Sequence, residues 1–157
     1  MSRRPSRGSF QSDRSNGYSL SWSTWEEFQV WLKKEQQDRG IQFVRKNKRM
    51  AKSGFPWMER HEFVCGRQGG GSAKEYTPKH PEWKRNVPSK RTGCPCRLTV
   101  KSYRDTAEIL GMYNEEHTHS IGNENLKFTP LSKEVRGTIA DMLKSGIETD
   151  HIVRKLI

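Results

Sequence analysis

The segment RTGCPCRLTV, Arg91–Val100, contains two of the chain's three cysteines, one residue apart, at the start of a run in which basic and apolar side chains alternate. Such alternation predicts a β-strand with one buried face, and we expect this strand over residues 96–103. A thiol at a strand entrance is either a small core side chain or a metal ligand. The second interpretation requires further ligands elsewhere in the chain.

Two histidines and the remaining cysteine supply those ligands. His117 and His119 lie one residue apart in EEHTHS, at the end of a second predicted strand, and Cys65 ends a third. Side chains two residues apart in a strand share a face, so both imidazoles can reach one point. Two cysteines with two histidines complete the tetrahedral ligand set of a structural Zn²⁺. We predict one such ion; the alternative is three buried thiols and a solvated histidine pair.

The choice between Cys94 and Cys96 is not settled by geometry. Both cysteines lie on the face that carries Leu98 and Val100, where a sulfur can be an ordinary core atom. Cys94 follows Gly93 at the strand entrance and has more freedom to turn toward a metal. Geometry therefore favours Cys94 and leaves Cys96 open.

The predicted fold class is α+β. Strand patterns follow one another without an intervening helix, which indicates a four-stranded antiparallel sheet, at residues 41–50, 57–65, 96–103 and 107–117. A helix precedes the sheet; Ser23 or Thr24 caps it, and Gly40 ends it. Residues 66–93 are rich in glycine, proline and charge, which predicts a long loop inserted between two strands.

The two ends of the chain differ in composition from the predicted domain, residues 22–122. Residues 1–21 are rich in serine, arginine and glycine, and we predict a disordered basic tail. Residues 128–157 contain two apolar helical patterns, capped by Ser132 and Thr149, which predict a helical hairpin. Its short glycine turn is compatible with a helix-turn-helix, although most such pairs only pack.

The composition limits the classes of function. Hydrophobic residues make up 31% of the 157 residues, against about 45–50% in ordinary globular chains, and a metal compensates for a small core. The net charge of +11 favours a polyanionic partner. No apolar run approaches the roughly 18–20 residues that span a bilayer, and no signal peptide is visible. The odd cysteine count favours free thiols and a reducing compartment.

The basic residues are concentrated in two stretches. Six lie between Arg45 and Arg60 with one acid, and seven lie between Lys84 and Arg104 with none. A solvated face is the simpler explanation, but two runs on adjoining strands favour a surface that binds double-stranded DNA. The candidate contacts are Arg45, Lys46, Asn47, Lys48, Arg49, Lys84, Arg85, Lys90, Arg91, Arg97 and Lys101.

Roles are assigned to some of these residues by chemistry. Arg45, Asn47 and Arg49 are expected on one face of the first strand, and arginine and asparagine are base-reading residues in the major groove. Phosphate contacts are expected from Lys46, Lys48, Arg97 and Lys101. The basic residues of the 66–93 loop are an alternative specificity element.

Four motifs occur in the order of a known zinc domain: GIQFVR (40–45), FVC ending at Cys65, RTGC ending at Cys94, and the His117–His119 pair. Over roughly residues 22–121 the chain resembles the far-red-impaired-response type of DNA-binding domain of Mutator-like transposases, a relative of the WRKY and glial-cells-missing domains. The long 66–93 insert and the missing WRKY heptapeptide exclude a plant WRKY domain proper.

The resemblance implies a ligand set and a function. It implies one zinc ion on Cys65, Cys94, His117 and His119, with Cys96 in the core, where the family often has a small residue. It also implies a transposase-derived or transcription-regulating module that binds specific duplex DNA in the nucleus, without a small-molecule substrate.

Other function classes stay open at this stage. The chain can be an RNA-binding or protein-interaction module. It can also be a small metal-dependent nuclease that uses the histidine pair with Glu115 or Glu116, but hard cations prefer oxygen ligands, which leaves the thiols without a role. A transposase catalytic core does not fit after residue 122, so we do not expect enzyme activity.

Overall fold

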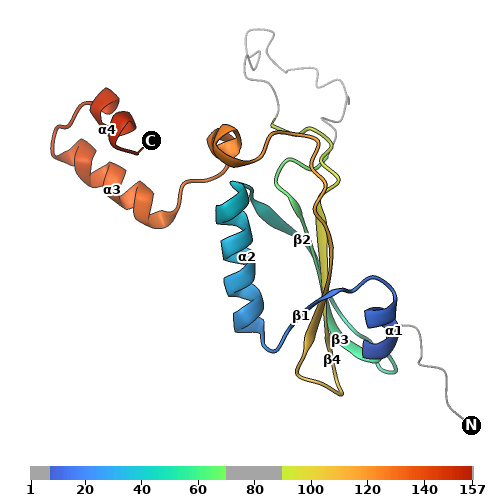
Figure 1. Ribbon diagram of the computed structural model, residues 1–157. Helices are drawn as coiled ribbons and strands as arrows, with labels where there is room; N and C mark the ends of the chain where they lie inside the picture. The colour runs from blue at the N-terminus through green and yellow to red at the C-terminus, as the bar shows by residue number, and fades with distance from the viewer. Residues whose placement is uncertain (1–7, 70–89, 157) are drawn as a thin grey trace, which may run out of the picture.

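The computed structural model describes residues 8–69 and 90–156 (Figure 1). Its centre is an antiparallel sheet in the order β1-β5-β4-β3-β2. The strands are β1 (Leu20–Trp22), β2 (Phe43–Met50), β3 (Trp57–Cys65), β4 (Arg97–Tyr103) and β5 (Ile109–Asn114). The prediction of a helix followed by an antiparallel sheet is confirmed. The predicted number of four strands is wrong, because β1 adds a fifth by pairing with β5.

Helix α2 (Trp25–Arg39) precedes the main hairpin of the sheet. The Thr24 hydroxyl accepts a hydrogen bond from the Glu27 N–H, and the Glu27 carboxylate accepts one from the Ser23 N–H, which is a capping box. Gly40 ends the helix with φ +57°, and a Cβ at this position would lie 2.6 Å from the Gly122 carbonyl oxygen. Glycine is therefore required both by the backbone and by the close approach of a second segment.

The core lies between α2 and one face of the sheet, as Figure 1 shows. Phe28 is its central side chain: it is 2% exposed and contacts the rings of Trp22 and Phe63 at 5.0 and 5.6 Å. The same core contains Leu98 and Val100 of β4 and Cys96, which directly precedes that strand. Trp25 and Trp31 of α2 also pack against this core.

A bulge in β2 decides which of its side chains face the core. Arg45 pairs with Phe63, but Asn47 pairs with the adjacent residue Glu62, so Lys46 is the extra residue. Directly paired residues point to the same side of a sheet, and Phe63 lies on the α2 side. Arg45 therefore lies on the α2 side and Asn47 on the other. The prediction that both share a face with Arg49 is wrong, because strict alternation fails at a bulge.

The N-terminal segment is folded from residue 8 onward. Helix α1 (Phe10–Ser15) lies across the sheet face opposite α2, where Phe10 and Tyr18 pack with Tyr103 and Leu110. The predicted disordered tail of residues 1–21 is thus wrong for its described part, while residues 1–7 lie outside the described residues. The polar composition of this segment does not reveal that Phe10 and Tyr18 pack against the sheet.

Three helical segments follow the sheet: η1 (Gly122–Phe128), α3 (Lys133–Lys144) and α4 (Thr149–Leu156). The Ser132 hydroxyl caps α3 by accepting from the Val135 N–H. Figure 1 shows the α3–α4 hairpin standing away from the sheet. Among the described residues, no helix has the length and apolar character needed to cross a membrane.

Candidate metal centre

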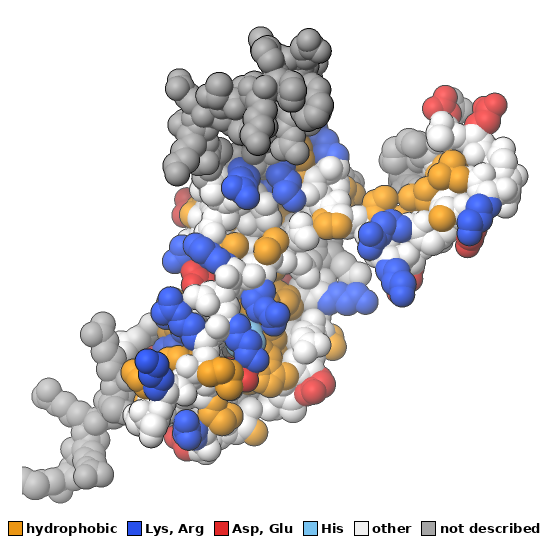
Figure 2. All heavy atoms as spheres, turned by 180° about the vertical axis from the view of Figure 1, so that it is seen from behind, with side chains coloured by type: hydrophobic (Ala, Val, Ile, Leu, Met, Phe, Trp, Pro, Cys, Tyr) orange, Lys and Arg blue, Asp and Glu red, His pale blue; other side chains and the backbone are white. Residues whose placement is uncertain are grey.

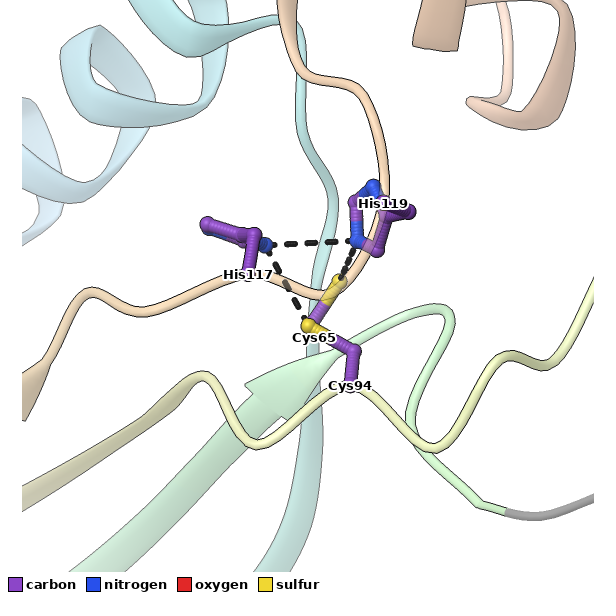
Figure 3. A group of neighbouring side chains, drawn as sticks. All are labelled: Cys65, Cys94, His117 and His119. Carbon is purple, nitrogen blue, oxygen red and sulfur yellow. Dashed lines mark hydrogen bonds between the residues drawn. The ribbon is translucent and has the colours of Figure 1, made fainter.

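Four side chains from three separate segments converge at one end of the sheet (Figure 3). Cys65 is the last residue of β3, Cys94 precedes β4, and His117 and His119 follow β5. One ligand atom from each lies within 4.8 Å of all the others, so the group can hold one metal ion. The structure brings together the four predicted ligands.

The spacing of the ligand atoms suits a tetrahedral ion. Cys65 Sγ lies 3.2 Å from His119 Nε2, and Cys94 Sγ lies 3.3 Å from His117 Nδ1. The two imidazole nitrogens, His117 Nδ1 and His119 Nε2, are 3.2 Å apart. Bonds of about 2.3 Å to sulfur and about 2.0–2.1 Å to nitrogen in a tetrahedron give edges of roughly 3.3–3.8 Å. These three edges are close to that size, and no pair of ligand atoms is more than 4.8 Å apart.

Hydrogen bonding orients one of the two imidazoles. His119 Nδ1–H donates to the Ser120 carbonyl at 2.8 Å, which leaves the Nε2 lone pair directed at the thiols. His117 turns its Nδ1 to the same point, and its buried Nε2 has no partner within the described part of the chain. The two histidines thus offer opposite ring nitrogens to one centre.

Burial favours the neutral form of two of the four ligands, Cys65 and His117. It raises the pKa of the Cys65 thiol well above its ordinary value, and the nearby Cys94 raises it further. Burial also lowers the pKa of His117, and the proximity of His119 acts in the same direction. A metal ion reverses this balance for the thiols, because it stabilises thiolates and needs neutral imidazoles.

Cys96 lies outside the group of four ligands. It is fully buried with Leu98 and Val100, and its carbonyl accepts the Cys65 N–H at 3.1 Å. Burial raises the pKa of its thiol to about 12, so the sulfur remains a protonated, apolar side chain.

A polar network that the sequence did not reveal holds the segments around the centre. Arg67 donates to the Lys90 carbonyl at 2.8 Å and to the Asn125 side-chain oxygen at 3.2 Å. Asn125 is 1% exposed and donates to the Gly40 carbonyl. The Arg67 N–H also approaches the Cys65 sulfur at 3.5 Å. No local motif marks this network, because the hydrogen bonds of the Arg67 and Asn125 side chains join residues 23 to 85 positions apart.

The predicted DNA contacts fall into distinct environments. Exposed side chains are found at Arg45, Lys46, Lys48, Arg49, Lys90, Arg91 and Arg97, while Asn47 is half-buried. Lys48 lies 3.3 Å from Glu59, and Arg97 lies 3.4 Å from Glu62. Lys84 and Arg85 lie outside the described residues.

Lys101 does not have the environment of a phosphate ligand. Its ammonium donates to both Asp13 oxygens at 2.9 Å beneath α1, and the residue is 9% exposed. The assignment of Lys101 to phosphate binding is therefore wrong. The alternating pattern of β4 is consistent with a side chain that points away from the core at Lys101, but no local sequence pattern predicts that α1 covers this position.

The acidic residues of the nuclease hypothesis do not join the cluster. The Glu115 side chain is 65% exposed and is bonded to Arg39, and Glu116 is exposed. Neither residue is among the four convergent ligands.

Comparisons with protein-family models, with curated proteins and with solved structures give no match for this chain.

Proposed function

We propose that the chain is a zinc-stabilised module that binds double-stranded DNA through the sheet face opposite α2 and the adjoining β2 edge. The observation that carries the proposal is the division of the sheet into two unlike faces. One face is closed by α2 and the aromatic core. The other carries exposed or half-exposed cations and is covered by α1 at one end only.

Zinc is the ion that the donor set favours. Two sulfurs and two imidazole nitrogens in a tetrahedral arrangement are typical of structural zinc sites. The ligands come from the ends of β3 and β5 and from the residues before β4, so the ion would hold three strands together at the end of the sheet that α1 does not cover. All four positions are filled by protein, which favours a structural over a catalytic role.

The cations of the open face come from three neighbouring strands. Strand register places Arg49 beside Arg60, and Arg97 lies on the same side through its pairing with Val64. Lys46 protrudes from the bulge at the sheet edge. Figure 2 shows Lys and Arg side chains along the body of the molecule, with fewer Asp and Glu side chains among them. Such a surface suits a phosphate backbone.

Asn47 and Arg49 are the base-reading candidates on this face. Both side chains have the donors and acceptors that recognise adenine and guanine edges in the major groove. Arg45, on the other side of β2, is better placed for a phosphate contact at the edge. With the motif resemblance, this arrangement supports a transposase-derived or transcription-regulating module that acts in the nucleus and has no catalytic activity of its own.

Competition binding tests the proposal. The zinc-loaded chain is titrated with a mixed-sequence duplex in the presence of unlabelled duplex, single-stranded DNA or RNA at fixed salt. We expect duplex DNA to compete best, and Arg97→Ala to lower the slope of log affinity against log salt by about one ion. Lys34→Ala, an exposed lysine on α2, is the control and should leave the slope unchanged. Stronger competition by RNA would support the RNA-binding alternative, and absence of nucleic-acid binding would refute the proposal.

A further inference from the structure

The hairpin that joins β2 to β3 exposes an unusual amount of apolar surface. Met50 is 61% exposed, Phe55 49% and Met58 42%. These three residues, called here the apolar tip, are three of the ten large hydrophobic side chains that are exposed among the described residues, and they lie within nine positions. Scattered exposed hydrophobic residues need no explanation, but a cluster on one protrusion indicates a contact surface.

The apolar tip stands on a defined base. The Ala51 N–H donates to the Met58 carbonyl at 2.8 Å and closes the hairpin. Gly54, at φ +94°, allows the turn, in which the Phe55 N–H approaches the Lys52 carbonyl at 3.3 Å. Phe55 packs against Trp57 with ring centroids 5.6 Å apart. Trp57 in turn pairs with the buried Tyr103 of β4, so the sheet holds the aromatic pair in place.

The charges around the apolar tip select one kind of partner. Between Arg45 and Arg60 the sequence has six basic residues and one acid, Glu59. Glu59 is engaged by Lys48 and by His61. Basic side chains on an edge strand can serve only to prevent strand pairing, but that role does not require exposed methionine and phenylalanine. Apolar side chains flanked in the sequence by cations match a nucleic acid, whose base faces become accessible between two rows of phosphates when a base step is partly unstacked.

We propose that the apolar tip inserts against the bases of the duplex, with Phe55 as the leading side chain and Arg49 and Lys52 on the flanking phosphates. This inference rests on the proposed function and adds to it a wedge that partly unstacks a base step. Apolar residues used in this way kink the duplex, and pyrimidine–purine steps yield most readily. The tip would therefore favour deformable steps without reading a base edge.

The test uses the zinc-loaded full chain and a mixed-sequence duplex that contains a fluorescent adenine analogue whose emission rises on unstacking. We expect wild-type protein to raise the emission. The single variants Phe55→Ser and Met58→Ser should each weaken duplex binding by about 5- to 150-fold. Each should also suppress the rise in emission, without changing the slope of log affinity against log salt. Val30→Ser removes a 70% exposed side chain from α2 and should change neither quantity.

Three outcomes would overturn the inference. If wild-type protein binds the duplex without a rise in emission, and Phe55→Ser binds equally well, the tip is not a wedge although the proposed function stands. If Phe55→Ser instead changes only the oligomeric state in sedimentation, the tip is a protein contact. If wild-type protein does not bind duplex DNA, the proposed function and this inference fail together. Melting temperatures close to that of the wild type would show that the variants are folded.

Discussion

At the scale of single residues, the candidate metal centre depends on which of two neighbouring thiols faces the other ligands. Cys94 and Cys96 are chemically identical and nearly equivalent in the sequence pattern. The structure separates them: Cys94 lies 3.3 Å from His117, whereas Cys96 is packed with Leu98 and Val100. The sequence predicted the four ligands: the position of Cys94 at the strand entrance favoured it over Cys96 without deciding the choice, and the motif resemblance then implied Cys94.

Replacement of each cysteine tests this assignment. Cys94→Ala should abolish metal binding and most of the fold, because metal affinity in such domains is folding free energy. Cys96→Ala should keep one metal per chain and lose about 0.5–3 kcal/mol of unfolding free energy by leaving a small cavity. Metal content by mass spectrometry and the thiolate-to-cobalt absorption of the Co²⁺ form measure the difference. If Cys96→Ala releases the metal and Cys94→Ala retains it, the assignment is reversed.

The Asp13–Lys101 ion pair is a second residue-scale feature, and here the sequence prediction failed. Asp13 accepts from Lys101 and from the Tyr103 hydroxyl at 2.7 Å, and both charged residues are buried. Tyr103 has a raised pKa, mainly through burial and then through this hydrogen bond. The contact joins residues 88 positions apart, and no local pattern predicts it.

Asp13→Asn should destabilise the protein strongly, because it leaves the Lys101 charge buried without a counter-charge. Breaking such a pair costs about 3–5 kcal/mol, which urea unfolding can measure. Asp141→Asn is the matched control: Asp141 and Lys144 lie 3.9 Å apart with side chains about four-fifths exposed, so the expected loss is roughly 0–1 kcal/mol. Equal effects of the two substitutions would show that α1 does not depend on the buried pair.

At the scale of elements, the bulge in β2 changes the expected reading surface. Period-two alternation predicted Arg45, Asn47 and Arg49 on one face, and this is the error that a single extra residue produces. The same alternation correctly identified β4, where regular pairing with β3 continues from Arg97 to Lys101. Sequence periodicity therefore predicts regular strands well and cannot detect the position of a bulge.

Alanine substitutions along β2 test the corrected arrangement on a preferred duplex obtained by binding-site selection. Asn47→Ala and Arg49→Ala should each cost about 1–3 kcal/mol on the preferred site and much less on random DNA. Arg45→Ala should weaken both duplexes equally and lower the salt slope by about one ion. A specific effect of Arg45→Ala, with none from Asn47→Ala or Arg49→Ala, would contradict the face assignment.

At the scale of the whole molecule, the small hydrophobic core of the sheet is supplemented by segments that pack on both of its faces and at one of its ends. α2 covers one face of the sheet, α1 covers part of the other, and the four candidate metal ligands converge at the end of β3 and β5. The composition, with 31% hydrophobic residues, predicts that the domain needs support beyond apolar burial, and the convergence of four candidate ligands is consistent with this prediction. The composition did not indicate that the N-terminal segment contributes a strand and a helix. The segment is rich in serine and arginine, and its apolar contacts depend on only a few residues, among them Phe10 and Tyr18.

The central claim is that a bound metal ion holds this sheet together, and thermal unfolding of the full chain with the bound metal counted tests it most directly. Melting is recorded with one equivalent of Zn²⁺, after chelation, and after zinc is restored. We expect one zinc per chain, a cooperative transition with zinc, loss of that transition on chelation, and recovery on readdition. A chain that contains no metal and melts at the same temperature in chelator as in zinc would contradict the account.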